Sequence, residues 1–411
     1  MKKVILSLAL LVSLPLSAHL GDHEALNGQP AFADLKDLRA LNIPVIAADP
    51  ETGVGFTYLT PKSAEELSIR SHQNGKCGGF ELLPPSESAS IAPYVNSLKE
   101  LNQLFHKEIF YQRAPFKQLS LNFNQAIPAA LSEVNEDYLR EDVEWLSSFP
   151  NRFNKSNDPN RHVFALRERL ERMLVQGQVP YSIEFISHKS TPQQSLKVTL
   201  PGKSRANEII VLGGHLDSIN QSWGGNKDIA PGADDNASGS ANLIEIMRIL
   251  IAQEQKERTI EIFWYAGEES GLLGSGEIAE TYKAQKKDVI AVVQLDMTLF
   301  PGSGEGTIAS MTDFTSAWLR DYFAEINKVY LKANVVTDKC GYGCSDHASW
   351  HRRGYPTLMP FEAKMNAMNK NIHTVNDKIS PALNFKHSAL YSKLGLAIAM
   401  DLGNSDLRQP Y

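Results

Sequence analysis

Histidine and carboxylate side chains follow several apolar runs of this chain, at the point where each run ends. His215 closes the run EIIVLGGH, Asp234 and Asp235 lie in the glycine-flanked turn APGADDNASG, and Glu268 and Glu269 follow TIEIFWYAG. Imidazole nitrogen and carboxylate oxygen are ligands that zinc accepts, and adjacent carboxylates repel one another unless a cation lies between them. Helix capping would need only one of the two aspartates. We therefore predict a two-metal hydrolase site.

Two further acidic residues and a second imidazole extend this prediction. Asp217 lies two residues after His215, where its carboxylate could accept a hydrogen bond from the imidazole and fix the tautomer. Asp296 closes the apolar run AVVQLD in the same way that His215 closes its own run. The spacing does not choose the second imidazole, for which the candidates are His347, His351, His373 and His387.

The elements that must position these side chains alternate between strand and helix. Apolar runs predict strands at residues 195–200, 208–212, 259–265 and 289–295. Apolar stripes at helical spacing predict helices at residues 138–146, 160–174, 238–252 and 271–284. This alternation predicts an α/β fold, with a twisted, mostly parallel mixed β-sheet covered by helices on both faces. Ligands at the carboxyl ends of such strands share one crevice.

Residues 1–120 differ in composition and pattern from the rest of the chain. Residues 1–18 combine Lys2 and Lys3 with a short apolar run and a small-residue end, the layout of a secretory signal peptide, so we expect a secreted, extracellular protein. Residues 19–120 contain scattered prolines and a helical run at 92–110. We interpret them as a pro-segment of a zymogen, and an accessory domain that stays attached is the alternative. The catalytic domain then spans residues 121–411.

The net charge limits the classes of binding partner, and the cysteine count raises the question of one unpaired thiol. The net charge of −6 over 411 residues, with no long basic run, argues against nucleic acid and anionic membranes, and we expect a monomer. Cys77 is the odd member of three cysteines. One hypothesis is that its thiolate caps a zinc ion in the unprocessed form, and the alternative is a partly buried cysteine without a catalytic role.

The order of the motifs resembles that of a known family. GGHLDS, APGADDNASG, EESGLLGS, QLDM, CGYGCSDHASWHRRGYP, MPFEAK and IHTVND occur in register between residues 148 and 402. In this order they resemble the zinc-dependent aminopeptidases of the bacterial leucyl aminopeptidase type, relatives of the glutamate carboxypeptidases. The resemblance implies a metalloprotease that releases the N-terminal residue from peptides with a free N-terminus.

The resemblance also implies a role for individual residues. One of two zinc ions per chain would be held by His215, Asp235 and Asp296, and the other by Asp235, Glu269 and His373. Glu268 resembles the general base, Asp217 the partner of His215, and Tyr342 a tyrosine that assists at the oxyanion. His347 is then not a ligand.

A substrate pocket and a disulfide complete the expectations. The residues that align with the pocket for the N-terminal side chain are Met297, Met311, Phe361, Met365, Met368 and Ile372, and they favour leucine-like residues. Met365 and Met368 stand where the family often has aromatics, and core filling is the alternative for Met297 and Met311. Cys340 and Cys344 are interpreted as a small-loop disulfide, with a metal-binding pair as the competing interpretation.

Three other functions stay open at this point. A glutaminyl cyclase on the same fold keeps similar metal ligands. A carboxypeptidase would need a cation for the substrate carboxylate, for which Arg352 and Arg353 are the candidates. A binding protein that had lost its metals would be expected to lack ligands or base, and this chain lacks neither.

Overall fold

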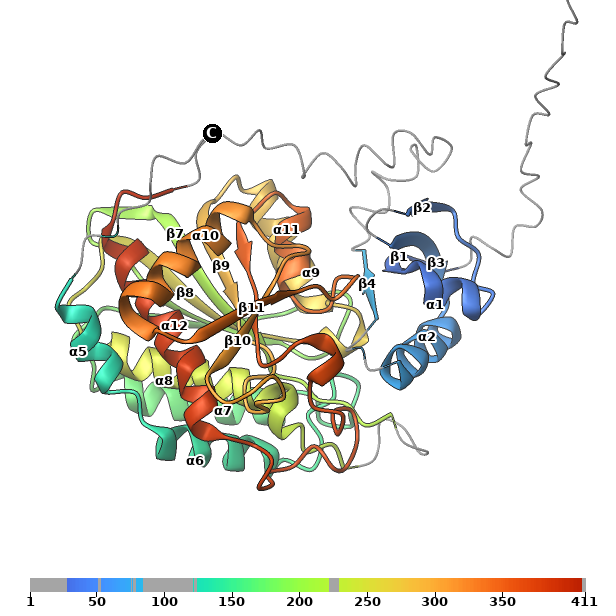
Figure 1. The fold of residues 1–411 in the computed structure, drawn as a ribbon, viewed down its shortest axis with the longest axis horizontal. Coiled ribbons are helices and arrows are strands. Elements are labelled where there is room, and N and C mark those ends of the chain that lie inside the picture. Colours follow the sequence, from blue (N-terminus) through green and yellow to red (C-terminus); the bar gives the residue numbers. More distant parts are fainter. Residues whose placement is uncertain are drawn as a thin grey trace, which may run out of the picture.

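The computed structural model describes residues 28–50, 53–74, 76, 79–83, 121, 124–221 and 229–408. The predicted signal peptide, the helical run at 92–110 and Cys77 lie outside these residues. Figure 1 shows a small N-terminal unit beside a larger α/β unit. The predicted metal ligands all lie in the larger unit. Within the described part of the chain, no helix is long and apolar enough to cross a membrane.

The N-terminal unit, residues 28–83, has a sheet and a core of its own. Its four-stranded antiparallel sheet has the order β2-β3-β1-β4, formed by β1 (Gln29–Asp34), β2 (Ala47–Asp49), β3 (Val54–Leu59) and β4 (Phe80–Leu82). Helices α1 (Leu35–Ala40) and α2 (Pro61–Gln73) pack beside it. Its two core clusters, which include Leu38, Phe56 and Leu67, contain no residue from beyond Leu83.

The larger unit is built on a six-stranded sheet with the order β12-β9-β7-β8-β6-β5. These strands are β5 (Ser182–Ile186), β6 (Ser195–Leu200), β7 (Arg205–His215), β8 (Arg258–Tyr265), β9 (Asp288–Gln294) and β12 (Thr357–Leu358). The pairs β12-β9, β9-β7 and β7-β8 are parallel, and the pairs β8-β6 and β6-β5 are antiparallel. The predicted mixed, mostly parallel sheet is therefore confirmed.

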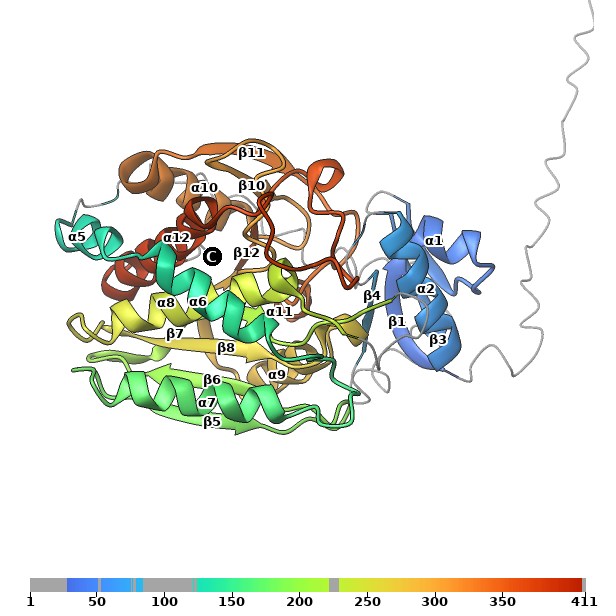
Figure 2. The same cartoon turned by 90° about the horizontal axis from the view of Figure 1, so that it is seen from below.

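Helices cover both faces of this sheet because its strands are apolar on both faces. Ile210 and Leu212 face one core and Ile209 and Val211 face the other, which is the period-two alternation of a strand. The first face packs against α6 (Glu136–Ser147), α7 (Arg161–Leu174), α8 (Gly239–Leu250) and α12 (Phe385–Asn404). The second packs against α9 (Leu273–Ala284) and α11 (His347–Arg352). Figure 2 shows α7 beside β6 and β5 and α8 beside β7 and β8.

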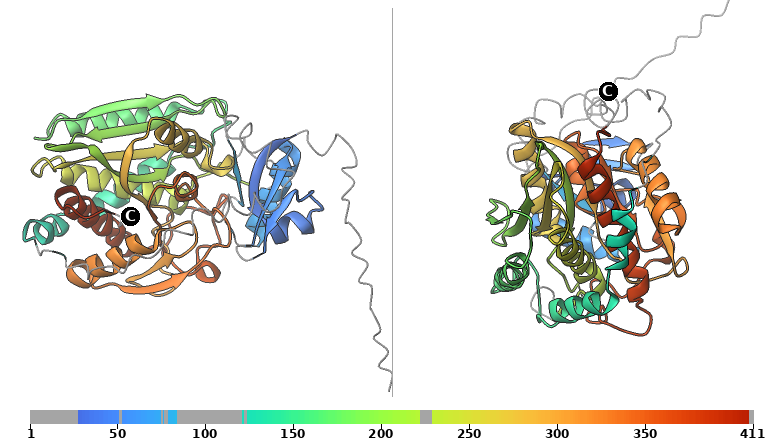
Figure 3. Two further views of the ribbon diagram at one scale, coloured as in Figure 1. Left: turned by 90° about the horizontal axis from the view of Figure 1, so that it is seen from above. Right: turned by 90° about the vertical axis from the view of Figure 1, so that its left-hand side faces the viewer.

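The remaining elements include a separate three-stranded sheet with the order β11-β10-β13, formed by β10 (Thr307–Met311), β11 (Asn334–Asp338) and β13 (Pro360–Phe361). Helix α10 (Ala317–Ile326) lies between its first two strands in the chain. Helix α5 (Ala126–Ser132) precedes α6. The sequence patterns did not predict this second sheet or β5, because these strands are short and only partly apolar. Figure 3 shows the N-terminal unit at one end of the larger unit.

Candidate metal centre and active site

The predicted ligands meet at the carboxyl ends of the parallel strands. His215 is the last residue of β7, Glu268 and Glu269 follow β8, and Asp296 follows β9. Asp235 precedes α8 in a turn, Ala233–Ser238, where its backbone is extended (φ −109°, ψ 94°). The aspartate pair therefore does not cap α8, and Asp235 points to the crevice instead.

A chain of short contacts joins these groups through Asp235. His215 Nε2 lies 3.1 Å from Asp235 Oδ1 and 3.3 Å from Asp296 Oδ1. His373 Nε2 lies 3.0 Å from Asp235 Oδ2 and 3.0 Å from Glu269 Oε2. The two oxygens of Asp235 thus face two different imidazoles, as a bridging carboxylate would. Ligand atoms of His215, Asp235 and Glu269 all lie within 4.8 Å of one another.

The electrostatics of this cluster fit a bound cation. Burial, together with the charges of Glu269 and Asp296, raises the pKa of Glu268 well above its usual value, and burial raises the pKa of Glu269 to about 7. Burial alone would lower the pKa of His373, but Glu269 and Asp235 raise it to about 10. Buried carboxylates this close together need positive charge among them, and a bound cation would supply it. No described donor hydrogen-bonds either carboxylate oxygen of Glu268. A cluster of nitrogen and oxygen ligands of this kind suits zinc.

Asp217 supports the cluster through its contact with His215 and through a second set of hydrogen bonds. Its carboxylate Oδ1 is 3.5 Å from His215 Nδ1, whereas its main-chain carbonyl lies closer, at 3.1 Å. The two carboxylate oxygens accept the backbone N–H groups of Glu268, at 3.0 Å, and Glu269, at 3.3 Å. Asp217 therefore holds the turn that carries both glutamates as well as facing the imidazole.

Two supporting residues had no predicted role. The carboxylate of Asp377 accepts the backbone N–H groups of Asp234 and Asp235, each at 3.0 Å. Burial and the charge of Asp234 raise the pKa of Asp377 to about 8, and the two N–H donors oppose that rise. Ser345 Oγ donates to Asp296 Oδ2 at 2.5 Å. Both residues lie in motifs quoted above, IHTVND and CGYGCSDHASW, but their types alone did not distinguish them.

A buried arginine holds the turn before Asp235. Arg152 is fully buried and donates to the carbonyl groups of Leu216, at 2.9 Å, and of Pro231 and Gly232, at 2.6 and 2.8 Å. Burial lowers its pKa to about 10, which still leaves it charged at neutral pH. Four carbonyl acceptors, including Leu146, compensate the loss of hydration. Arg152 thereby joins the segment after α6 to the loops that follow β7.

The predicted pocket residues gather in one apolar cluster beside the site. Met297, Met311, Phe361, Met368 and Ile372 are buried together, and Met365 packs against them. Tyr342 belongs to the same cluster. The predicted disulfide between Cys340 and Cys344 is formed, which rules out the competing metal pair and closes the loop around Tyr342.

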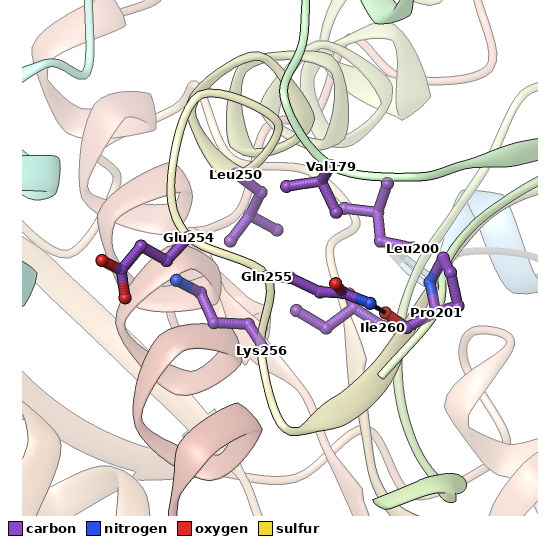
Figure 4. Close-up of a pocket in the computed structure, with 8 residues that line it drawn as sticks. All are labelled: Val179, Leu200, Pro201, Leu250, Glu254, Gln255, Lys256 and Ile260. Carbon is purple, nitrogen blue, oxygen red and sulfur yellow. Dashed lines mark hydrogen bonds between the residues drawn. The ribbon is translucent and has the colours of Figure 1, made fainter. Parts of the chain in front are cut away.

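The histidines that competed with His373 lie elsewhere. His347 begins α11, and burial lowers its pKa to about 3. His351 Nδ1 contacts the Thr357 hydroxyl at 3.3 Å, and His387 Nε2 contacts the Glu362 carbonyl at 3.1 Å. A small cavity of about 10 Å³ lies near Ile260, at the amino end of β8 and so at the opposite end of that strand from Glu268 (Figure 4). It is far too small for a substrate.

The N-terminal unit contacts three loops of the larger unit near the site. The side chains of Ser68 and Gln221 are hydrogen-bonded, and the Gln221 backbone N–H donates to the carbonyl of His373 at 2.9 Å. Leu82 N donates to Gly271 O at 2.9 Å, just after the paired glutamates. Lys76 Nζ lies 5.7 Å from the ring centre of Tyr342.

Comparison with known proteins gives consistent results. Residues 196–390 match the model of peptidase family M28. "Leucine aminopeptidase 1" of Phaeosphaeria nodorum is 34% identical over 319 residues, covering 75% of this chain and 79% of that protein. Among solved structures, the LapA aminopeptidase of Legionella pneumophila is similar with a TM-score of 0.77 at 27% identity, over 92% of this chain and 98% of that one. LapB of the same organism is similar with a TM-score of 0.76 at 25% identity, over 92% and 100%.

Proposed function

We propose, from the premise that this chain belongs to peptidase family M28 and is a zinc-dependent aminopeptidase, that it uses two zinc ions to release leucine-like residues from peptide N-termini. The observation that carries the proposal is the carboxylate of Asp235, whose oxygens lie 3.1 Å from His215 Nε2 and 3.0 Å from His373 Nε2. A single carboxylate between two imidazoles is the arrangement that a bridged pair of metals needs.

The ligand assignment follows from these contacts. His215, Asp235 and Asp296 would hold one zinc ion, and Asp235, Glu269 and His373 the other. Bound zinc polarises the substrate carbonyl and makes water more acidic. The amine of the free N-terminus is attracted to the same acidic group of side chains.

Glu268 is the proposed general base. It is buried beside the ligands, follows the same strand as Glu269, and its oxygens have no described hydrogen-bond donor, so they are available to a water or a substrate. Its carboxylate would take a proton from the attacking water and pass that proton to the nitrogen of the leaving amine. The hydroxyl of Tyr342, pinned by the disulfide loop, would donate to the carbonyl oxygen as negative charge develops there.

The apolar cluster supports the preference for leucine-like residues. The methionines among the predicted pocket residues come from the loop after β9, from β10 and from the loop after β13, and all contribute flexible, uncharged side chains. The predicted pocket residues within this cluster are Met297, Met311, Phe361, Met365, Met368 and Ile372. Such a pocket adapts to branched aliphatic side chains and disfavours charged ones.

The N-terminal unit is the proposed pro-segment of a secreted precursor. Its separate core and its contacts with Gln221, Gly271 and Tyr342 support a unit that covers the mouth of the site until it is removed. We propose that the processed enzyme acts as a monomer on peptides outside the cell.

A substrate panel tests the proposal. The protein is cleaved between the N-terminal unit and the larger unit, and its activity on aminoacyl p-nitroanilides is measured with and without chelator. Elemental analysis gives the number of bound zinc ions. We expect two zinc ions per chain, release of leucine faster than of alanine or glutamate, and loss of activity that zinc restores. Cyclisation of a glutaminyl peptide or release of C-terminal residues in place of these results would refute the proposal. Absence of bound zinc in active protein would refute it as well.

A further inference from the structure

A carboxylate of the N-terminal unit is buried between two arginines of the larger unit. Glu81, the middle residue of β4, is 1% exposed. One of its oxygens accepts a hydrogen bond from Arg352 Nε, and the other accepts from Arg353 Nη1 at 3.2 Å. Each oxygen thus has its own cationic donor, and hydrogen bonds between charged partners are stronger than those between neutral ones.

Strand β4 also passes between the two loops that carry catalytic groups. Leu82 N donates to Gly271 O, two residues beyond Glu269, at 2.9 Å. On the other side, a Cβ placed on Gly343, next to Tyr342, would lie 3.7 Å from Glu81 Oε2. Strand β4 therefore lies between the loop that follows Glu269 and the loop that carries Tyr342, beyond the carboxyl end of β8 (Figure 2).

The two arginines depend on this carboxylate to different extents. Arg353 also donates to the carbonyl of Ser349 at 2.8 Å and lies 3.7 Å from Glu280, both in the larger unit. Within the described part of residues 124–408, no carboxylate pairs with Arg352, which stacks on Phe314 and on Phe32 of the N-terminal unit. No described acceptor reaches its Nη2. Removal of the N-terminal unit therefore takes Glu81, the carboxylate paired with it, away from the Arg352 guanidinium.

We propose that Arg352, Arg353 and the Gly271 carbonyl form a binding site for the substrate chain beyond the scissile bond, and that Glu81 and Leu82 occupy this site in the intact protein. The arginines bind a carboxylate of the substrate, and the carbonyl accepts a backbone N–H. The carboxylate has two sources, the C-terminus of a short peptide or an acidic side chain. This inference rests on the proposed aminopeptidase function and specifies which peptides the enzyme prefers.

A preference for substrates with a carboxylate is expected because the guanidinium groups of Arg352 and Arg353 are partly buried. Leaving them without an anion costs free energy. A carboxylate that replaces Glu81 restores the charge-assisted hydrogen bonds, which are about twice as strong as neutral ones, whereas an amide restores neutral contacts only. The difference acts on binding of the downstream chain, so it changes kcat/KM between peptides that share the same N-terminal leucine.

The test compares matched peptides. The full chain is purified intact and cut at a protease site introduced into residues 84–120. The N-terminal unit is then separated at high salt, which screens the Glu81 ion pairs. Leucine release is measured for peptides with one to four glycines after the leucine, each as the free acid and as the C-terminal amide. A second pair of amides, Leu-Gly-Glu-Gly and Leu-Gly-Gln-Gly, distinguishes a side-chain carboxylate from a terminal one.

We expect kcat/KM about tenfold higher for the carboxylate member of at least one pair. In Arg352→Met this ratio falls toward one, and in Arg352→Lys it is intermediate, because lysine keeps the charge but not the planar fork. Arg172→Met, which removes an exposed arginine from α7, is the matched control and keeps the wild-type ratio. Equal kcat/KM within every pair for the wild-type enzyme overturns the inference, even if every variant fails to fold. Failure to release leucine from any peptide overturns the proposed function instead.

Discussion

Replacement of Asp377 by asparagine tests how the bridging aspartate is held. The two carboxylate oxygens of Asp377 accept the backbone N–H groups of Asp234 and Asp235, each at 3.0 Å, and the side chain is 1% exposed. Asparagine has one oxygen, so it can accept only one of these N–H groups. Its NH2 group then faces the second N–H, donor against donor, where water does not compensate.

The magnitude follows from the cost of one buried, unsatisfied donor. That cost is about 1–3 kcal/mol. This cost destabilises the conformation in which Asp235 faces the metal. Zinc binding then weakens about 5- to 100-fold, because each 1.4 kcal/mol is a factor of ten. Loss of a residue that supports a metal ligand has effects of the same size, about 10- to 100-fold.

The assay is competition for zinc between the protein and a chromogenic chelator. Asp377→Asn should require more free zinc for half-maximal activity, and kcat should recover at saturating zinc because the ligands and Glu268 are unchanged. Asp321→Asn, which removes an exposed charge from α10, is the control and should match the wild type. An unchanged zinc affinity in Asp377→Asn would show that these two hydrogen bonds do not position Asp235.

The other predictions concern the base, a ligand support and a buried histidine. Glu268→Gln should retain zinc by elemental analysis but lose turnover by about 100- to 10,000-fold, and near-normal rates would remove Glu268 from the role of base. Ser345→Ala removes the donor to Asp296 Oδ2 and should weaken zinc binding about tenfold, which the same chelator competition measures; equal affinity would contradict this support. Burial lowers the pKa of His162 from 6.5 to about 3, and its Nε2 contacts the Gln193 amide at 2.9 Å. Since the unfolded chain binds the proton more readily, the free energy of unfolding should fall below pH 6.5 by up to about 1.4 kcal/mol per pH unit until pH 3. Urea unfolding at pH 7 and pH 5 should show a smaller loss of unfolding free energy for His162→Gln than for the wild type. An equal loss in the two proteins would refute this account.

The amino-acid sequence was enough to predict the central part of the fold. The strand containing Ile209 to Leu212 and the helix after Asp235 were predicted from apolar periodicity, because side chains alternate along a strand and recur along a helix. The helices of both faces follow from strands that are apolar on both faces. The convergence of His215, Glu269 and Asp296 also follows, since the carboxyl ends of parallel strands meet at one edge.

The sequence did not predict contacts that depend on long loops. His373 lies in a loop between β13 and α12, and only the family resemblance, not the spacing, selected it over three other histidines. The structure brings its Nε2 to 3.0 Å from Asp235. The position of such a loop depends on packing with several distant segments, which no local pattern encodes.

The sequence by itself therefore determined β6 to β9, the helices beside them and the ligand types, because these depend on neighbours a few residues apart. Only the tertiary structure decided that Asp377 holds the backbone of Asp235 and that Glu81 lies between Arg352 and Arg353. These pairs are separated by 142, 271 and 272 positions. Whether such distant groups meet depends on how the helices, strands and loops of the whole chain pack. Burial then strengthens the hydrogen bonds between them, because the local dielectric constant is low.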